Sequence, residues 1–287
     1  MRLQSLRDRL ASAAERAPEL ERWARARVPG ADLALDAARR ELRAFGGLVA
    51  GGLAYRLFLW LVPFGLVVAT LLGFWLEIDP DAVRQAGREF GIGAASIGEA
   101  SRAVEARPGS RVAILLLGLW LLAWFTLGAV RALRLAAALA WGLERTRMRK
   151  PAHAVGVFNG LFLAAALSFA ALAWFRDVLG AGALLTSAGL LAIQIMIALA
   201  IFWLLPRRAD RWQDLLPGAA LLAVGAELMH VVVAFYFVPR LERSSELYGA
   251  LGTATVLLVW LYLYARLFTS GMFLNATLWE RRRAPSP

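Results

Sequence analysis

Cysteine is absent from this chain of 287 residues, and histidine occurs only twice. The absence of cysteine excludes disulfides, a thiolate nucleophile and a thiolate metal site. The two histidines, His153 and His230, lie far apart in the sequence and cannot form a pair with metal-ligand spacing. Phosphate-binding loops, nucleophile elbows and hydrolytic metal motifs are also missing. We therefore expect no catalytic residues, no metal and no cofactor, and predict that the protein is not an enzyme.

Charged residues are also scarce, at 18%, whereas 60% of the residues are hydrophobic and the mean hydropathy is +0.58. A soluble domain is roughly half apolar and about a quarter charged. The net charge of +11 could indicate nucleic-acid binding, but the basic residues form short runs between long apolar segments. That pattern suits an anionic membrane surface better. The composition predicts a membrane protein with lipids as partners and no nucleic acid.

Six apolar segments are long enough to cross roughly 30 Å of hydrocarbon as helices of about 20 residues. They lie at 49–76, 112–130, 154–175, 183–205, 215–238 and 250–278. We predict an all-α polytopic membrane protein with six transmembrane helices in a membrane domain at 47–279. An amphipathic helix in a cytoplasmic segment at 1–46, a helical outer connection at 77–111 and a basic tail at 280–287 complete the predicted organisation. The polar start of the chain shows no pattern of a signal peptide.

Arginine accumulates in alternate connections between these segments. Basic residues precede the first span and follow the second, fourth and sixth spans. In this order they are Arg39, Arg40 and Arg43; Arg131, Arg134, Arg145, Arg147, Arg149 and Lys150; Arg207, Arg208 and Arg211; and Arg281, Arg282 and Arg283. Basic residues in short connections stay on the cytoplasmic side. In the opposite connections acidic residues balance the basic ones. The pattern predicts that both termini are cytoplasmic and that 77–111 lies outside.

Glycine and proline mark places where the predicted helices could pack or bend. Gly47 and Gly51 are four residues apart on one helix face, which allows a second helix to approach closely. Pro63 removes a backbone hydrogen bond inside the first span, so it could kink the helix or act as a hinge, and a kink is favoured. Pro217 lies at the beginning of the fifth span, and we assign it a role in helix packing or as a hinge.

Five polar residues within the spans are candidates for substrate binding: Arg56, Glu227, His230, Arg266 and Asn275. An unpaired ion at mid-bilayer costs roughly 3 kcal/mol on insertion scales, so Arg266 should face a partner. Glu227 in the fifth span could lie at the same depth as Arg266 in the sixth, and His230, one turn further along, could join them. Arg56 either faces the interior or extends to the phosphates of the inner leaflet. We predict that Glu227 and Arg266 share a polar pocket, and a neutralised structural pair is the alternative.

Several longer motifs resemble those of one family nearly end to end. They are Ala54-Tyr55 with Pro63 eight residues after the tyrosine, "LWLLAWFTLGAVRALRLAAALAWGLERTR" at the second span, "LLP" at 204–206, Pro217-Gly218-Ala219, and "YGALGTATVLLVWLYLYARLFTSGMFLNA". The chain thus resembles the YihY/BrkB family of bacterial inner-membrane proteins, once labelled ribonuclease BN. It departs from the family pattern at Met272 and Phe273, where the family has alanine and glutamate. It also departs at Arg56, where an aromatic or small residue is frequent.

The resemblance implies a six-helix fold in the bacterial inner membrane and a link to the cell envelope. Two functions stay open: a transporter or translocase of a lipid or other anionic amphiphile, and a non-catalytic structural or regulatory membrane protein. The first predicts polar groups around a cavity at membrane depth, whereas the second predicts fully paired charges. A channel would need rings of charge, which only a homo-oligomer could build. Ribonuclease activity is not expected, because metal ligands and a basic cleft with stacking aromatics are both missing.

Overall fold

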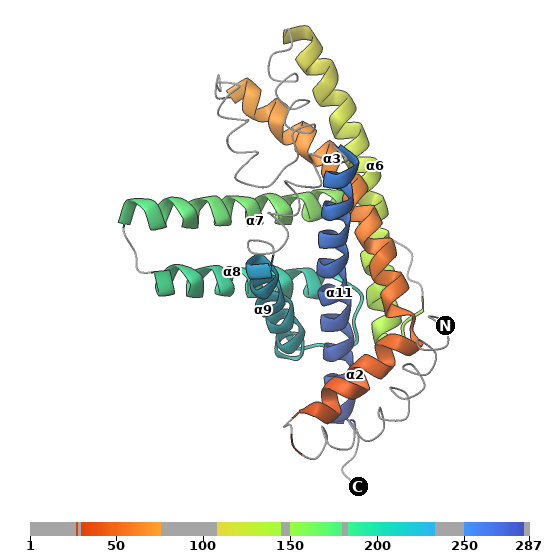
Figure 1. Ribbon diagram of the computed structural model, residues 1–287. Coiled ribbons are helices and arrows are strands. Elements are labelled where there is room, and N and C mark those ends of the chain that lie inside the picture. Colours follow the sequence, from red (N-terminus) through yellow and green to blue (C-terminus); the bar gives the residue numbers. More distant parts are fainter. Residues whose placement is uncertain are drawn as a thin grey trace, which may run out of the picture.

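The computed structural model describes residues 27, 30–75, 108–144, 150–179, 183–232 and 250–283. Within these ranges the regular structure is entirely helical (Figure 1). The helices are α2 (Ala31–Arg43), α3 (Gly46–Trp75), α6 (Pro108–Trp141), α7 (Pro151–Leu179), α8 (Ala183–Leu204), α9 (Leu216–Val232) and α11 (Ala250–Arg283), with a 3₁₀ turn η1 (Trp212–Asp214) before α9. The prediction of an all-α fold is therefore confirmed for this part of the chain.

Three of the described helices are long and apolar enough to cross a membrane. They contain the segments Gly46–Val68, Val112–Trp141 and Ala254–Arg283, in α3, α6 and α11. Three shorter apolar segments, Pro151–Ala165, Leu191–Leu204 and Leu216–Met229, lie in α7, α8 and α9. Each predicted span thus coincides with a helix, whereas six membrane crossings remain a prediction. The helix α6 continues past the predicted end at 130 to Trp141, because the leucines and alanines after Val130 favour helix and keep most of the segment apolar.

The three longest helices form the centre of the molecule (Figure 1). α3 packs against both α6 and α11, and α9 packs between α8 and α11. The short helix α2 crosses the C-terminal end of α11. α7 and α8 lie side by side and run crosswise to α6 and α11 in Figure 1. The helix α3 runs through Pro63 and changes direction along its length, as expected when proline removes an intrahelical hydrogen bond.

Small side chains dominate the core around α3, α6 and α11. Fully buried alanines such as Ala50, Ala137 and Ala276 let the helix backbones approach closely. A second cluster centres on Trp60, whose ring is stacked on Phe64 and lies edge-on to Phe158 of α7. In contrast, large apolar side chains of α6 point outward; they include Leu116, Trp120 and Trp124. This distribution is typical of helices whose outer surface contacts lipid.

Several predictions fall on residues that the structure does not describe. Residues 77–107 of the predicted outer connection at 77–111 lie outside the described residues. The segments 1–26, 233–249 and 284–287 lie outside them as well. The helix α9 contains His230, but the position of its side chain is not described. His153 lies exposed in the first turn of α7.

Candidate functional site

The carboxylate of Glu41 is the centre of a polar cluster between α2 and α11. Glu41 is 6% exposed, and its Oε1 accepts a hydrogen bond from Arg266 Nη1 at 2.6 Å. The hydroxyl of Ser270 donates to Oε2 at 2.9 Å. The Thr269 hydroxyl lies 3.4 Å from Oε1 and 2.9 Å from the Arg266 carbonyl oxygen, so its single proton serves the nearer carbonyl. A charge-assisted pair and a hydroxyl thus neutralise a carboxylate that is removed from water.

A tight turn between α2 and α3 brings Glu41 into this position. The turn contains Phe45, whose φ of 53° lies in the left-handed region that L residues with side chains rarely adopt. Gly46 follows and begins α3. A methyl group at Gly46 would overlap Glu41 Cγ and lie 3.0 Å from both the Glu41 carbonyl oxygen and Oε1. Glycine is needed at Gly46 because the backbone passes directly beside the Glu41 side chain.

The predicted pair of Arg266 with Glu227 is wrong, because the carboxylate bonded to Arg266 belongs to Glu41. Glu227 accepts a hydrogen bond from Gln194 Nε2 of α8 at 3.2 Å. Arg266 points toward α2 and α3 instead, because its guanidinium bonds Glu41 and would lie 3.7 Å from a methyl group added at Gly47. Similar depth in two helices is therefore not enough, since the rotation of α11 directs Arg266 toward α2 and α3.

Arg56 does not join this cluster either. Gly47 and Gly51 face α11, where methyl groups added to them would lie 3.7 Å from Arg266 Nη1 and 4.0 Å from Tyr262 Cε2. Arg56 lies on the opposite side of α3, nine residues or about 180° from Gly47. Its exposed side chain extends over Gly128 of α6, where an added methyl group would lie 3.0 Å from Nη1. The structure thus separates Arg56 from Arg266 by the width of α3.

Asn275 is 1% exposed, and its amide is bonded within the fold. Its Oδ1 accepts from the backbone N–H of Gly218 at 2.7 Å, and its Nδ2 donates to the carbonyl of Leu215 at 3.1 Å. The Gly218 N–H is in the first turn of α9, where backbone donors have no partner inside the helix. Pro217 in the same turn has no N–H that needs a partner. Asn275 therefore caps α9 and fixes it to α11.

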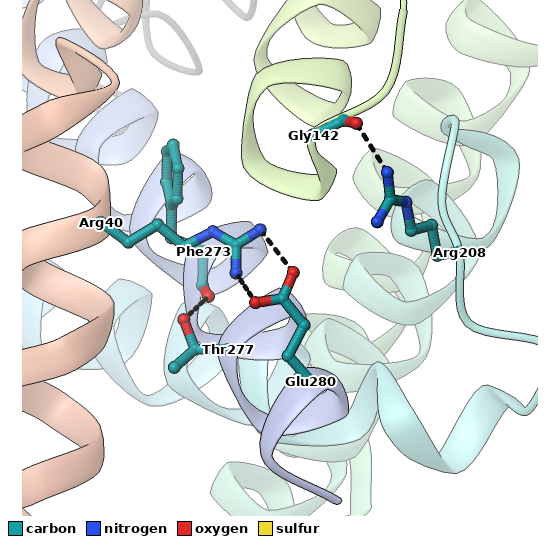
Figure 2. A network of polar contacts seen from close by, with 6 residues as sticks. All are labelled: Arg40, Gly142, Arg208, Phe273, Thr277 and Glu280. Atoms are coloured by element: carbon teal, nitrogen blue, oxygen red, sulfur yellow. Dashed lines mark hydrogen bonds and ion pairs between the residues drawn. The ribbon is translucent and has the colours of Figure 1, made fainter. Parts of the chain in front are cut away.

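Ion pairs tie the C-terminal end of α11 to α2 on one side and to the segment before α9 on the other. Figure 2 shows the Arg40 guanidinium facing the Glu280 carboxylate, with Nη2 at 2.9 Å from Oε1. Arg281 pairs with Asp36 of α2, and Arg282 pairs with Asp214 at 2.8 Å. Figure 2 also shows Arg208 donating to the Gly142 carbonyl at 2.8 Å, beyond the end of α6. Among the arginines assigned to one membrane side from the sequence, Arg40, Arg208, Arg281 and Arg282 thus make contacts at helix ends on this side of the described structure.

An arginine-lined cavity of about 410 Å³ lies along α2. Its lining residues are Asp36, Arg39, Arg40, Arg43 and Ala44. Leu42 and Phe45, each 73% exposed, lie beside this lining in the sequence. The α2 helix therefore combines guanidinium groups with exposed apolar side chains, which is the surface expected of a helix at a lipid interface.

A second cavity of about 360 Å³ lies in the connection from α8 to α9. It is lined by Trp203, Asp210, Arg211, Trp212 and Gln213. The Arg207 guanidinium is stacked 3.7 Å over the Trp203 ring. Partial burial lowers the pKa of Arg207, and the opposing charge of Asp210 offsets only part of this effect. Exposed tryptophans beside arginine are typical of a membrane–water interface.

The family model described as virulence factor BrkB matches residues 38–287. The chain belongs to the BrkB family. It is 34% identical over 93 residues to a protein of Bordetella petrii named "UPF0761 membrane protein Bpet3042", covering 30% of this chain and 20% of that protein. It is 28% identical over 103 residues to "UPF0761 membrane protein Nmul_A0452" of Nitrosospira multiformis, covering 36% and 24%. The resemblance stated from the sequence motifs is thereby confirmed.

A third relative of this BrkB-family chain is "Putative ribonuclease-like protein YfkH" of Bacillus subtilis, 27% identical over 93 residues that cover 32% of this chain and 34% of the relative. The matched segments thus span only about a fifth to a third of the lengths of these relatives. No solved structure matches the chain significantly. Within the described residues, no group of three or more histidine, cysteine, aspartate or glutamate side chains could hold a metal ion.

The departure from the family pattern after Gly271 falls in the core of this BrkB-family protein. Met272 and Phe273 are each 2% exposed. Phe273 also offers its carbonyl oxygen to the Thr277 hydroxyl at 2.8 Å (Figure 2). Position 273 therefore carries no carboxylate, and the carboxylate that neutralises Arg266 is Glu41 of α2.

Sequence reasoning missed Glu41, which lies in the segment predicted to form an amphipathic N-terminal helix. One signal could have found it. Ala37 and Glu41 are four residues apart and are the two buried residues of α2. A carboxylate on the small-residue face of a short helix, beside a span with an intramembrane arginine, indicates an ion pair between the two helices.

Proposed function

We propose that this BrkB-family protein is a multi-pass protein of the bacterial inner membrane that translocates a lipid or another anionic amphiphile. The observation that carries the proposal is the arginine-lined cavity of α2, with exposed Leu42 and Phe45 beside it. Guanidinium groups bind phosphate and carboxylate oxygens in paired hydrogen bonds. The adjacent apolar side chains would cover the first part of an acyl chain. Cation and apolar surface thus meet where an anionic amphiphile would present its headgroup.

The ion pairs of α11 support an even number of membrane crossings between α2 and the end of the chain. Arg40 and Asp36 of α2 pair with Glu280 and Arg281, so the two ends of the membrane domain lie on the same side. Crossings by α3, α6 and α11 alone would place them on opposite sides. We propose that α7, α8 and α9 supply the remaining crossings, and that both termini are cytoplasmic because of the arginine pattern.

The proposed activity has no catalytic step and needs no cofactor, metal or nucleic acid. Its partners are membrane lipids. Anionic lipids of the cytoplasmic leaflet attract clustered arginines by about 1 kcal/mol per residue near the surface. Arg39, Arg40 and Arg43 would concentrate such lipids at the inner end of α3 before any movement across the membrane.

A translocation assay tests this proposal. The protein is reconstituted into phosphatidylcholine vesicles that contain a trace of fluorescent phosphatidylglycerol, and a membrane-impermeant quencher reports how much label changes leaflet. We expect faster exchange with the protein than in empty vesicles, and at least a several-fold loss in the double variant Arg39→Gln, Arg43→Gln. The matched control is Arg211→Gln, which removes an exposed arginine at the second cavity. Exchange at the rate of empty vesicles with the unmodified protein would rule out lipid translocation.

The alternative is a non-catalytic structural or regulatory membrane protein. It is favoured by one observation: Arg266, the arginine near the middle of α11, is bonded to a carboxylate within the chain. If this alternative is right, the ion pairs between α2 and α11 have a structural role and bind no ligand. Normal insertion and envelope phenotype with no lipid exchange in the vesicle assay would support it.

A further inference from the structure

The donors of α11 that hold Glu41 have the composition of a headgroup site. We propose that Arg266, Thr269 and Ser270 bind the phosphate or carboxylate of an anionic amphiphile, and that Glu41 occupies this site as an internal substitute for the ligand. This inference rests on the proposed function and deepens it, because it assigns the substrate class to particular side chains. It also gives the mid-helix arginine a role beyond neutralising one acid.

The geometry of the Glu41 carboxylate shows what the site can bind. Oε1 of Glu41 accepts a hydrogen bond from the Arg266 guanidinium at 2.6 Å, and Oε2 accepts one from the Ser270 hydroxyl at 2.9 Å. The Thr269 hydroxyl, 3.4 Å from the first oxygen, can rotate to donate a third hydrogen bond. A phosphate offers more acceptor oxygens than a carboxylate and would use all three donors. Arginine with two hydroxyls is thus a better match to a phosphate than to the side chain now bound there.

The arginine of the site is partly exposed, whereas its carboxylate is buried. The Arg266 side chain is 34% exposed, whereas that of Glu41 is 7% exposed. Gly47 places no side chain against the guanidinium, and a methyl group added there would lie 3.7 Å from Arg266 Nη1. Phe45 and Leu48, on either side of Gly46 and Gly47 in the sequence, expose apolar side chains where α3 begins. An amphiphile could therefore place its headgroup at Arg266 and its chain along α3.

The helix that carries Glu41 is attached in a way that allows it to move. It is joined to α3 by the turn at Ala44 and Phe45, where the positive φ of Phe45 stores backbone strain. Its other contacts with α11 include the Arg40–Glu280 and Arg281–Asp36 pairs, whose side chains are partly exposed, and such pairs are weak and screened by salt. Displacement of Glu41 would release α2 from α11 and relieve the strained turn. Ligand binding and movement of α2 are thus coupled through one carboxylate.

Because the chain has no cysteine, one introduced thiol can report the position of α2. Ala37 is 7% exposed and lies on the same face of α2 as Glu41 without belonging to the site. Full-length Ala37→Cys protein is placed in nanodiscs of phosphatidylcholine, with or without phosphatidylglycerol, and the rate of maleimide labelling is measured. We expect phosphatidylglycerol to increase the labelling rate several-fold. A separate arm adds inorganic phosphate to phosphatidylcholine nanodiscs, and acceleration there would show that the anion alone suffices.

Variants separate a ligand site from a structural pair. In the Ala37→Cys background, Glu41→Gln should label rapidly with either lipid, because the neutral amide binds Arg266 weakly. Thr269→Val keeps the bonds of Glu41 to Arg266 and Ser270 but removes the hydroxyl that a phosphate would gain, so it should raise the phosphatidylglycerol concentration needed for half the effect by about tenfold, the effect of one charge-assisted hydrogen bond. Glu227→Gln is the matched control, since it removes a carboxylate bonded to α8 and should change nothing.

Two outcomes would overturn the inference. One is a labelling rate of Ala37→Cys that is the same in both lipids and with phosphate. The other is an unchanged phosphatidylglycerol response in Thr269→Val, a change of similar shape that leaves the Glu41–Arg266 pair in place. Neither outcome depends on lipid exchange between leaflets. A protein that labels as expected but moves no lipid would retain the site and lose the translocase function.

Discussion

Glu41 is the more deeply buried partner of its pair with Arg266, with a side chain 7% exposed against 34%. Removing one partner of a buried pair costs about 3 to 5 kcal/mol, because the remaining charge is left without compensation. The pair therefore holds α2 against α11 only while both charges are present, and an external anion is the natural replacement for the Glu41 carboxylate.

The backbone beside Glu41 gives a prediction at the scale of one methyl group. Gly46→Ala should destabilise the protein by about 3 kcal/mol, because the new methyl group overlaps Glu41 Cγ and forces the carboxylate away from Arg266. The matched control is Gly47→Ala, where the nearest atom would be Arg266 Nη1 at an ordinary contact of 3.7 Å. Alanine is the better helix former, so the control should be neutral or slightly stabilising. Thermal unfolding of the two variants in one detergent measures the difference, and equal Tm values would contradict the close approach.

At the scale of elements, α9 is fixed to α11 by backbone contact and by Asn275. A methyl group at Gly218 would overlap the Gly271 carbonyl oxygen and lie 2.5 Å from Asn275 Nδ2. Further along, a methyl group at Gly225 would lie 2.7 Å from Leu267 Cδ2. The two helices thus cross with their backbones in contact at Gly218 and Gly271 and with the Leu267 side chain packed on Gly225, as small residues permit in membrane proteins.

This crossing predicts that Gly218→Ala destabilises the protein more than Asn275→Ala. In the first variant neither backbone can yield, so the helices must separate, and we expect a loss above about 3 kcal/mol. In the second the capping bonds of α9 are lost, at a cost of roughly 1 to 2 kcal/mol. Gly156→Ala in α7, with no atom within 4 Å of the added methyl group, is the control and should not lower the Tm. A larger loss in Asn275→Ala would show that the cap, rather than the close crossing, determines how α9 packs.

The helices could be predicted from the sequence, whereas the partner of Arg266 could not. Long apolar runs determine where helices form, and each predicted span coincides with one of α3, α6, α7, α8, α9 and α11. The choice between Glu41 and Glu227 depends on the rotation of α11, and a shift of two residues around a helix reverses the face. Glu41 comes from a short helix outside the predicted spans, and only its crossing over α11 shows that it is buried.

For the whole molecule, the ends of the membrane domain meet on one side through Arg40–Glu280 and Arg281–Asp36. The ion pairs at this end also include Arg282–Asp214, so the connection before α9 lies there as well. On the proposed topology, an even number of crossings separates α2 from η1, and η1 from the end of α11. The crosswise direction of α7 and α8 in Figure 1 shows that the described helices do not all run parallel. The number of crossings contributed by α7, α8 and α9 thus decides the topology.

The absence of native cysteine allows this topology to be measured with single introduced thiols. We predict that a cysteine at Ser101, in the predicted outer connection, is labelled by an impermeant maleimide added to intact spheroplasts. Cysteines at Gln213 beside η1 and at Ser286 near the C-terminus should be labelled only after the membrane is opened, because the arginine-rich side stays in the cytoplasm. A cysteine at Ala181, between α7 and α8, decides between the alternatives: six crossings require labelling from outside, like Ser101. If Ala181→Cys were protected in spheroplasts and labelled with Gln213→Cys, α7 and α8 would not cross the membrane, and the even count would have to come from α9.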